Sequence, residues 1–175
     1  YTQKYKDVFP QIISADEDNA FEILTEYLNV EPDHPNSNLR LANIYIKRYK
    51  EADVLRDYAR ALALADQAKQ RLVKAKVTID DREVRKNEEY YIGLLPNGQY
   101  SYTAIAAYID AEYAAVDEFS SKLPPIYTEF TNSVEKYDEV VKEFSSIVGA
   151  HNSLKELYLL YDEALSQRLS SLKSN

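Results

Sequence analysis

Residues 35–50 read PNSNLRLANIYIKRYK, and the order of apolar and polar side chains in this stretch decides the fold. Leu41 and Tyr45 are four residues apart, and Ala42 lies beside them on the same side of a helix. The small Ala42 lets another helix come close, and the ring of Tyr45 fills the space next to it. The stretch therefore predicts a helix over residues 37–50 that packs against a neighbouring helix.

The rest of the chain shows the same helical periodicity. Its apolar residues recur at three- and four-residue intervals, and its three Gly and six Pro fall in clusters. The pattern predicts an all-α protein. The expected helices cover residues 1–13, 16–30, 37–50, 54–76, 79–93, 102–122, 125–148 and 153–173. The turn signal LLPNGQYS at residues 94–101 predicts a boundary between a region 1–95 and a region 100–175.

Capping signals predict where several helices begin and end. Three pairs have the spacing of a capping box, in which a hydroxyl and an acidic side chain satisfy backbone groups of the first helical turn. They are Ser14 with Glu17, Thr78 with Asp81, and Ser153 with Glu156. Gly149 is expected to end the helix before it, and Pro124 the helix that starts near residue 102.

Residues 15–49 resemble the tetratricopeptide repeat family, an array of helical hairpins with a period near 34 residues. The positions that carry the resemblance are Leu41, Ala42, Asn43 and Tyr45 in a first helix, and Ala20, Leu24 and Pro32 in the second helix of the preceding repeat. The resemblance implies degenerate helical hairpins over about residues 15–93. Two features depart from the family pattern: Pro10 lies inside the first expected helix, and the helix over residues 54–76 starts late and is long.

The resemblance also implies a binding face. In the family, the position of Asn43 and its neighbours point into a concave groove that holds an extended peptide or its terminal carboxylate, which assigns Arg40, Asn43 and Lys47 to that face. Tyr90 and Tyr91, beside the expected boundary, form a second candidate contact patch. The alternative is that Asn43 only joins adjacent helices, that the basic residues are solvated, and that these Tyr rings only pack.

Charge is distributed unevenly along the chain. Residues 40–86 carry 13 basic and 7 acidic side chains, a net of +6, whereas the remaining residues carry 8 and 22, a net of −14. The positive segment suits an acidic peptide or a carboxylate as its partner. The intramolecular alternative is that this segment lies opposite the acidic C-terminal helices.

Residues 102–173 contain apolar side chains that alternate three and four residues apart, as in coiled coils. One such seam contains Tyr127, Phe130, Val134, Tyr137, Val141, Phe144 and Val148. Similar seams before and after it contain Ile105, Ile109, Val116, Phe119 and Leu123, and Leu154, Tyr158, Tyr161, Leu165 and Leu172. Because short connections make consecutive helices antiparallel, the region predicts an antiparallel three-helix bundle.

The sequence gives no support for catalysis or for a cofactor. The chain has no Cys, and its two His residues, His34 and His151, fall in predicted turns without the glycines of a nucleophile elbow. Pro32 interrupts the Glu31 and His34 spacing that a metal-binding helix would need, so no metal site is expected. The acidic balance argues against nucleic acid as a partner. The chain has no run of about 20 apolar residues, so no insertion into a membrane is expected.

Two functions remain. The favoured one is a non-catalytic scaffold that binds a protein segment through its repeat-like groove. The alternative is a structural spacer or self-association domain, which seams exposed along one side of the C-terminal region would favour. The Tyr-, Asn- and Lys-rich composition is similar to helical segments of cell-envelope proteins from Bacteroidota bacteria. That similarity implies a periplasmic or cell-envelope location, with the cytoplasm as the alternative.

Overall fold

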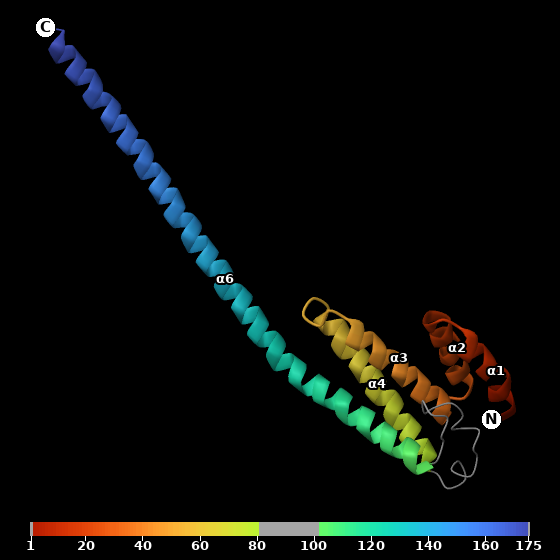
Figure 1. The fold of residues 1–175 in the computed structure, drawn as a ribbon. Helices are drawn as coiled ribbons and strands as arrows, with labels where there is room; N and C mark the ends of the chain where they lie inside the picture. The colour runs from red at the N-terminus through yellow and green to blue at the C-terminus, as the bar shows by residue number, and fades with distance from the viewer. Residues whose placement is uncertain (1, 81–101, 175) are drawn as a thin grey trace. The chain divides into compact units, whose positions relative to one another are not determined.

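The computed structural model describes residues 2–80 and 102–174 of the 175-residue chain. Over these residues the protein is all-α, as predicted, without any strand. Its helices are α1 (Thr2–Ser14), α2 (Glu17–Val30), α3 (Pro35–Glu51), α4 (Tyr58–Ile79) and α6 (Tyr102–Lys173) (Figure 1). The chain divides into two compact units, Tyr1–Tyr127 and Thr128–Asn175, so the second unit consists of the C-terminal part of α6.

The first four helices lie close to their predicted positions, but two of the predicted caps are wrong. Asp16, not Ser14, is the N-cap of α2, and its carboxylate accepts a hydrogen bond from the backbone N–H of Asn19 at 2.9 Å. Ser14 is still part of α1, and its hydroxyl donates to the carbonyl of Pro10. Thr78 lies inside α4 and donates to the carbonyl of Lys74. A hydroxyl that bonds back into its own helix cannot cap the next one.

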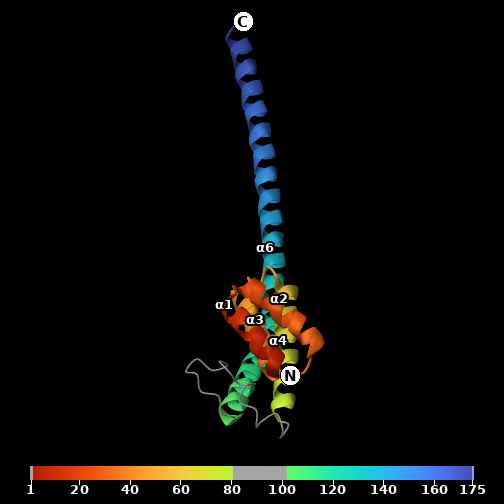
Figure 2. The same cartoon turned by 90° about the vertical axis from the view of Figure 1, so that its right-hand side faces the viewer.

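The helices of the first unit follow one another in space. α1 packs on α2, α2 on α3, and α3 on α4, with α3 and α4 side by side in both views (Figures 1 and 2). α3 begins at residue 35 and α1 at residue 2, a separation of 33 residues, whereas α4 begins 41 residues after α2, at residue 58 against residue 17. The late start and the 22-residue length of α4 confirm the predicted irregularity. The tetratricopeptide resemblance itself stays a prediction.

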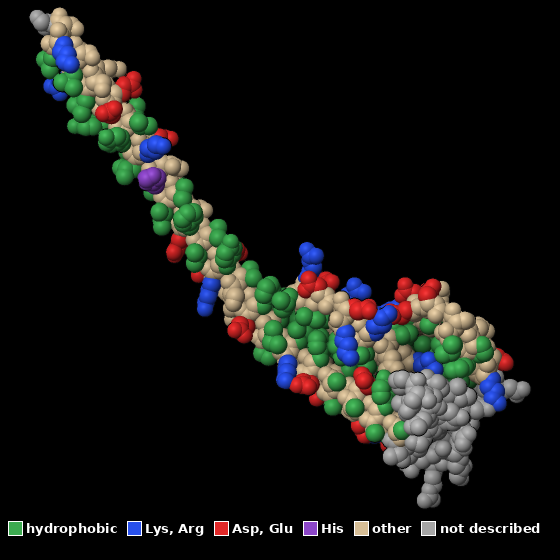
Figure 3. Space-filling view, in the orientation of Figure 1, with side chains coloured by type: hydrophobic (Ala, Val, Ile, Leu, Met, Phe, Trp, Pro, Cys, Tyr) green, Lys and Arg blue, Asp and Glu red, His purple; other side chains and the backbone are tan. Residues whose placement is uncertain are grey.

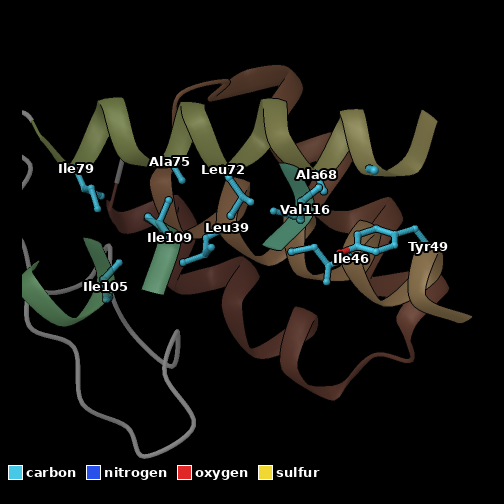
Figure 4. Close-up of a cluster of buried hydrophobic side chains, with 12 residues drawn as sticks. Leu39, Ile46, Tyr49, Ala68, Leu72, Ala75, Ile79, Ile105, Ile109 and Val116 are labelled. Atoms are coloured by element: carbon cyan, nitrogen blue, oxygen red, sulfur yellow. The ribbon is translucent and has the colours of Figure 1, made fainter. Parts of the chain in front are cut away.

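A dry core holds α3, α4 and the first part of α6 together. Small residues on α4, Ala65, Ala68 and Ala75, are fully buried and let the neighbouring helices approach closely. Figure 4 shows larger side chains from the three helices meeting around Leu72, which is also fully buried. A second cluster joins α1 and α2 to Leu41 of α3. Each full burial of a Leu or Ile stabilises the fold by roughly 1.5–3 kcal/mol.

The prediction of three antiparallel helices over residues 102–173 is wrong, because α6 is a single helix of 72 residues. Pro124 and Pro125 lie inside it. In a helix interior each proline removes a backbone hydrogen bond and its ring crowds the carbonyl four residues before it, at a cost of about 3 kcal/mol, yet the helix continues through both. Gly149 is helical as well, and the hydroxyl of Ser153, predicted to begin a new helix, donates to the Gly149 carbonyl at 3.2 Å. The expected boundary at residues 94–101 lies outside the described residues. So does the expected helix over residues 79–93, except for residues 79 and 80, where α4 ends.

Candidate interaction surfaces

The three basic or amide residues predicted to face a groove do line one hollow of the first unit. Arg40, Asn43 and Lys47 lie three and four residues apart on α3, and all three border a hollow of about 280 Å³ between α1, α2 and α3. Ile12, Ala20, Leu24 and Ile44 give the same hollow an apolar lining. The hollow therefore combines an apolar floor with polar groups from α3 and with Glu17 of α2.

Charged neighbours inside the protein already engage Lys47. Its ammonium lies 2.5 Å from a Glu17 carboxylate oxygen and 3.8 Å from Glu51. The hydrogen bond between them raises the pKa of Lys47 and lowers the pKa of Glu17. Arg48 also reaches α2, with its guanidinium 3.2 Å from Glu17 and 2.8 Å from Asp18. A ligand carboxylate at this hollow must compete with the side chains of α2.

Arg40 and Asn43 also have partners within the first unit. The Nε of Arg40 donates to the Asn36 Oδ1 at 2.9 Å, and its guanidinium lies 5.0 Å from the centre of the Phe9 ring. The Oδ1 of Asn43 accepts from the hydroxyl of Tyr108 at 3.1 Å, which joins α3 to α6. This bond gives Asn43 the helix-joining role considered as an alternative, while binding of a partner at the hollow stays a prediction. Tyr90 and Tyr91 lie outside the described residues.

The positive middle segment is paired in part with acidic residues of the first unit. On α4, Lys69 lies 2.5 Å from Asp117 of α6, and Lys76 forms an ion pair with Asp110. These contacts agree with the intramolecular alternative for the positive segment. Among the described residues, no contact supports the other interpretation, in which the positive segment attracts an acidic partner.

Sequence reasoning missed a cluster of buried polar side chains at the start of α3. His34, Asn36, Ser37 and Asn38 are all fully buried. His34 is the N-cap of α3, because its Nδ1 accepts the backbone N–H of Ser37 at 3.1 Å. Burial lowers the pKa of His34 to about 3. The signal in the sequence was a polar residue followed by Pro at the first helical position, which is typical of a helix start.

This polar cluster connects three helices. The Nδ2 of Asn38 donates to the carbonyls of Pro32 at 2.9 Å and His34 at 3.0 Å, and its Oδ1 accepts from Nη1 of Arg71 on α4 at 3.1 Å. Asn36 accepts from the hydroxyl of Tyr5 on α1. Because buried polar groups are costly unless bonded, these contacts indicate a structural role in fixing the α2–α3 turn.

The second unit presents a different surface, an apolar face on a helix exposed along nearly its whole length. Every residue from Thr128 to Ser174 is exposed except Thr131, which is half-buried. Apolar side chains spaced three, four or seven residues apart form a stripe, which we call the seam, and Figure 3 shows apolar side chains along the visible face. The seam contains Phe130, Tyr137, Val140, Phe144, Ile147, Leu154, Tyr158, Tyr161, Leu165 and Leu172, each between 41% and 69% exposed.

No ion pair supports this helix over residues 129–173, all of which the structure describes. Most helical stability in proteins comes from packing of an apolar face, and Gly149 in the middle of this helix costs about 1 kcal/mol relative to Ala. Exposed apolar side chains in a continuous stripe are typical of a surface that another protein covers.

Comparisons with other proteins give no indication of function, so a function can be proposed only from these surfaces. No known protein family matches the chain, and neither a curated protein nor a solved structure is similar to it. In the described ranges, residues 2–80 and 102–174, no three His, Cys, Asp or Glu side chains gather as metal ligands would. The same described ranges contain no helix that is both long and apolar enough to span a membrane.

Proposed function

We propose that this chain is a non-catalytic protein–protein interaction module. Its docking element is the part of α6 that forms the second unit. The seam supports the proposal: ten large apolar side chains, each at least 41% exposed, follow one stripe of a helix that has no ion pair of its own over residues 129–173. A partner that covers the stripe supplies the burial that stabilises such a helix in water.

Site-specific photo-crosslinking tests this proposal. A photoreactive phenylalanine analogue replaces Phe144 or Tyr158 in the seam and, as matched controls, Lys142 or Glu156 on the polar side of the same helix. In the cells that produce the protein, the seam positions are expected to form protein adducts and the polar positions few or none. Adducts that are equally weak at all four positions would exclude the seam as a docking surface.

A second candidate function is binding of a protein segment at the hollow between α1, α2 and α3. The observation in its favour is that Arg40, Asn43 and Lys47, which the repeat resemblance assigned to a binding face, border one hollow. Asn43→Ala and Tyr108→Phe remove the same hydrogen bond, but only the first changes the lining of the hollow. Both variants are compared with the photoreactive analogue placed at position 47. If they change adduct formation there equally, Asn43 has a structural role alone.

A further inference from the structure

We propose that the seam of residues 128–173 pairs with the same seam of a second copy of this chain, in antiparallel orientation. This inference rests on the proposed function and names the partner. Beyond the proposed function, it specifies both which chain covers the seam and the direction of that chain's helix.

The area available on the seam is sufficient for a stable pair. Its ten side chains are 41–69% exposed, and at roughly 100 Å² of remaining surface each, about half of what an aromatic side chain buries, they offer on the order of 1,000 Å² per helix. A standard interface buries about 800 Å² per partner. One further helix with the same stripe therefore covers enough apolar surface.

The distribution of charge selects the orientation. Residues 128–150 carry five acidic and two basic side chains, a net of −3, whereas residues 151–173 carry three of each and are neutral. Parallel pairing places the acidic halves side by side, which is repulsive. Antiparallel pairing places each acidic half beside a neutral one and brings Arg168 and Lys173 opposite the acidic stretch 129–139.

The order of seam residues is compatible with this orientation. In antiparallel coiled coils, alternate seam positions of the two helices face each other. Phe144 then faces Tyr161, and Ile147 faces Tyr158, so the aromatic rings of one half pack against large side chains of the other. In a parallel pair, each Arg168 lies directly opposite the Arg168 of the other copy, whereas in the antiparallel pair it faces Tyr137.

Oligomeric state and orientation are tested on the purified 175-residue chain. Sedimentation equilibrium at micromolar concentration is expected to give twice the chain mass of 20.2 kDa. The double variant Ile147→Glu with Leu154→Glu should be monomeric, with a dissociation constant raised at least 100-fold. The control Ser146→Glu with Ser153→Glu, which adds the same charges one residue away from the seam, should remain dimeric.

Spin labels then determine the direction of the helices, since the chain has no native Cys. With Glu135→Cys alone, an antiparallel dimer places the two labels roughly 50 Å apart at about 1.5 Å per residue, whereas a mixture with Ser170→Cys chains gives a short distance between 135 and 170. A short distance between two 135 labels would overturn the antiparallel orientation.

The outcomes separate this inference from the proposed function. A wild-type chain that stays monomeric at millimolar concentration, or that assembles from three or more copies, overturns the antiparallel pair. If such a monomer still forms seam adducts with a different protein in cells, the interaction module stands without self-pairing. Absence of both dimer and adducts refutes both proposals.

Discussion

Asn38 gives the sharpest test of the buried polar cluster, because one side chain connects the α2–α3 turn to α4. Asn38→Ala removes its bonds to the carbonyls of Pro32 and His34 and its bond from Arg71. Two neutral bonds contribute about 1 kcal/mol each, and a bond from a charged group about 1.5–3 kcal/mol. Ala is the better helix former by about 0.7 kcal/mol, so the free energy of unfolding should fall by about 3–4 kcal/mol.

Urea unfolding followed by near-ultraviolet circular dichroism of Tyr measures this change, because the chain has no Trp and 16 Tyr. Asn29→Ala on the exposed side of α2 is the matched control and should leave the free energy of unfolding within about 0.5 kcal/mol of wild type. Asn38→Asp keeps an acceptor for Arg71 but places a buried carboxylate oxygen against the carbonyls of Pro32 and His34, so it should destabilise at least as much as Asn38→Ala. A loss below about 1 kcal/mol for Asn38→Ala would refute the role assigned to the cluster.

Three further changes test the core, the long helix and the buried His. Leu72→Ala should lower the free energy of unfolding by about 2–5 kcal/mol in urea titrations. The control is Val73→Ala at the half-exposed neighbouring residue, which should lower it by about 0.5 kcal/mol or less. Gly149→Ala meets open space and should stabilise the helix locally by about 1 kcal/mol, read as slower amide exchange over residues 145–153; unchanged exchange would contradict a continuous helix there. Because the folded pKa of His34, about 3, lies below its unfolded value of about 6.5, the unfolded chain takes up the proton first as pH falls. Stability should therefore be constant above pH 6.5 and decrease by about 2 kcal/mol by pH 5, and His34→Asn, which keeps a capping side chain, should abolish that decrease.

The helices of the first unit could be predicted from the sequence because local and tertiary signals agree there. Ala42 and Tyr45 lie on a face that packs, and the Pro at residue 35 both ends the turn and starts α3. The cap of α2 was misassigned by two residues, since Ser14 and Asp16 both suit an N-cap and only the backbone decides between them. The bonds of Asn38 could not be predicted, because they depend on Arg71, 33 residues away.

The candidate site was predictable in part. The repeat resemblance placed Arg40, Asn43 and Lys47 on one side of a helix, and they do border one hollow. Their partners could not be read from spacing: Glu17 lies on α2 and Tyr108 on α6, and both contacts need the helices to be packed first. A sequence pattern identifies residues that share a face, whereas the ion pairs that occupy them follow from the tertiary structure.

The error in the C-terminal region concerns both what the apolar side chains face and which of them share a stripe. Apolar residues three and four positions apart were recognised, but the prediction placed Val134, Val141 and Val148 in a seam where the exposed stripe has Val140 and Ile147. Pro124 and Gly149 were taken as ends because each disfavours helix. In a helix interior Gly costs about 1 kcal/mol and Pro about 3 kcal/mol, yet the helix of 72 residues continues through both Pro124 and Gly149. A second unit that consists of one helix cannot cover its own stripe in the way a bundle would. In the proposed pair, a second copy meets this requirement for burial, and the acidic first half and neutral second half of the stripe make the antiparallel orientation the electrostatically favourable one.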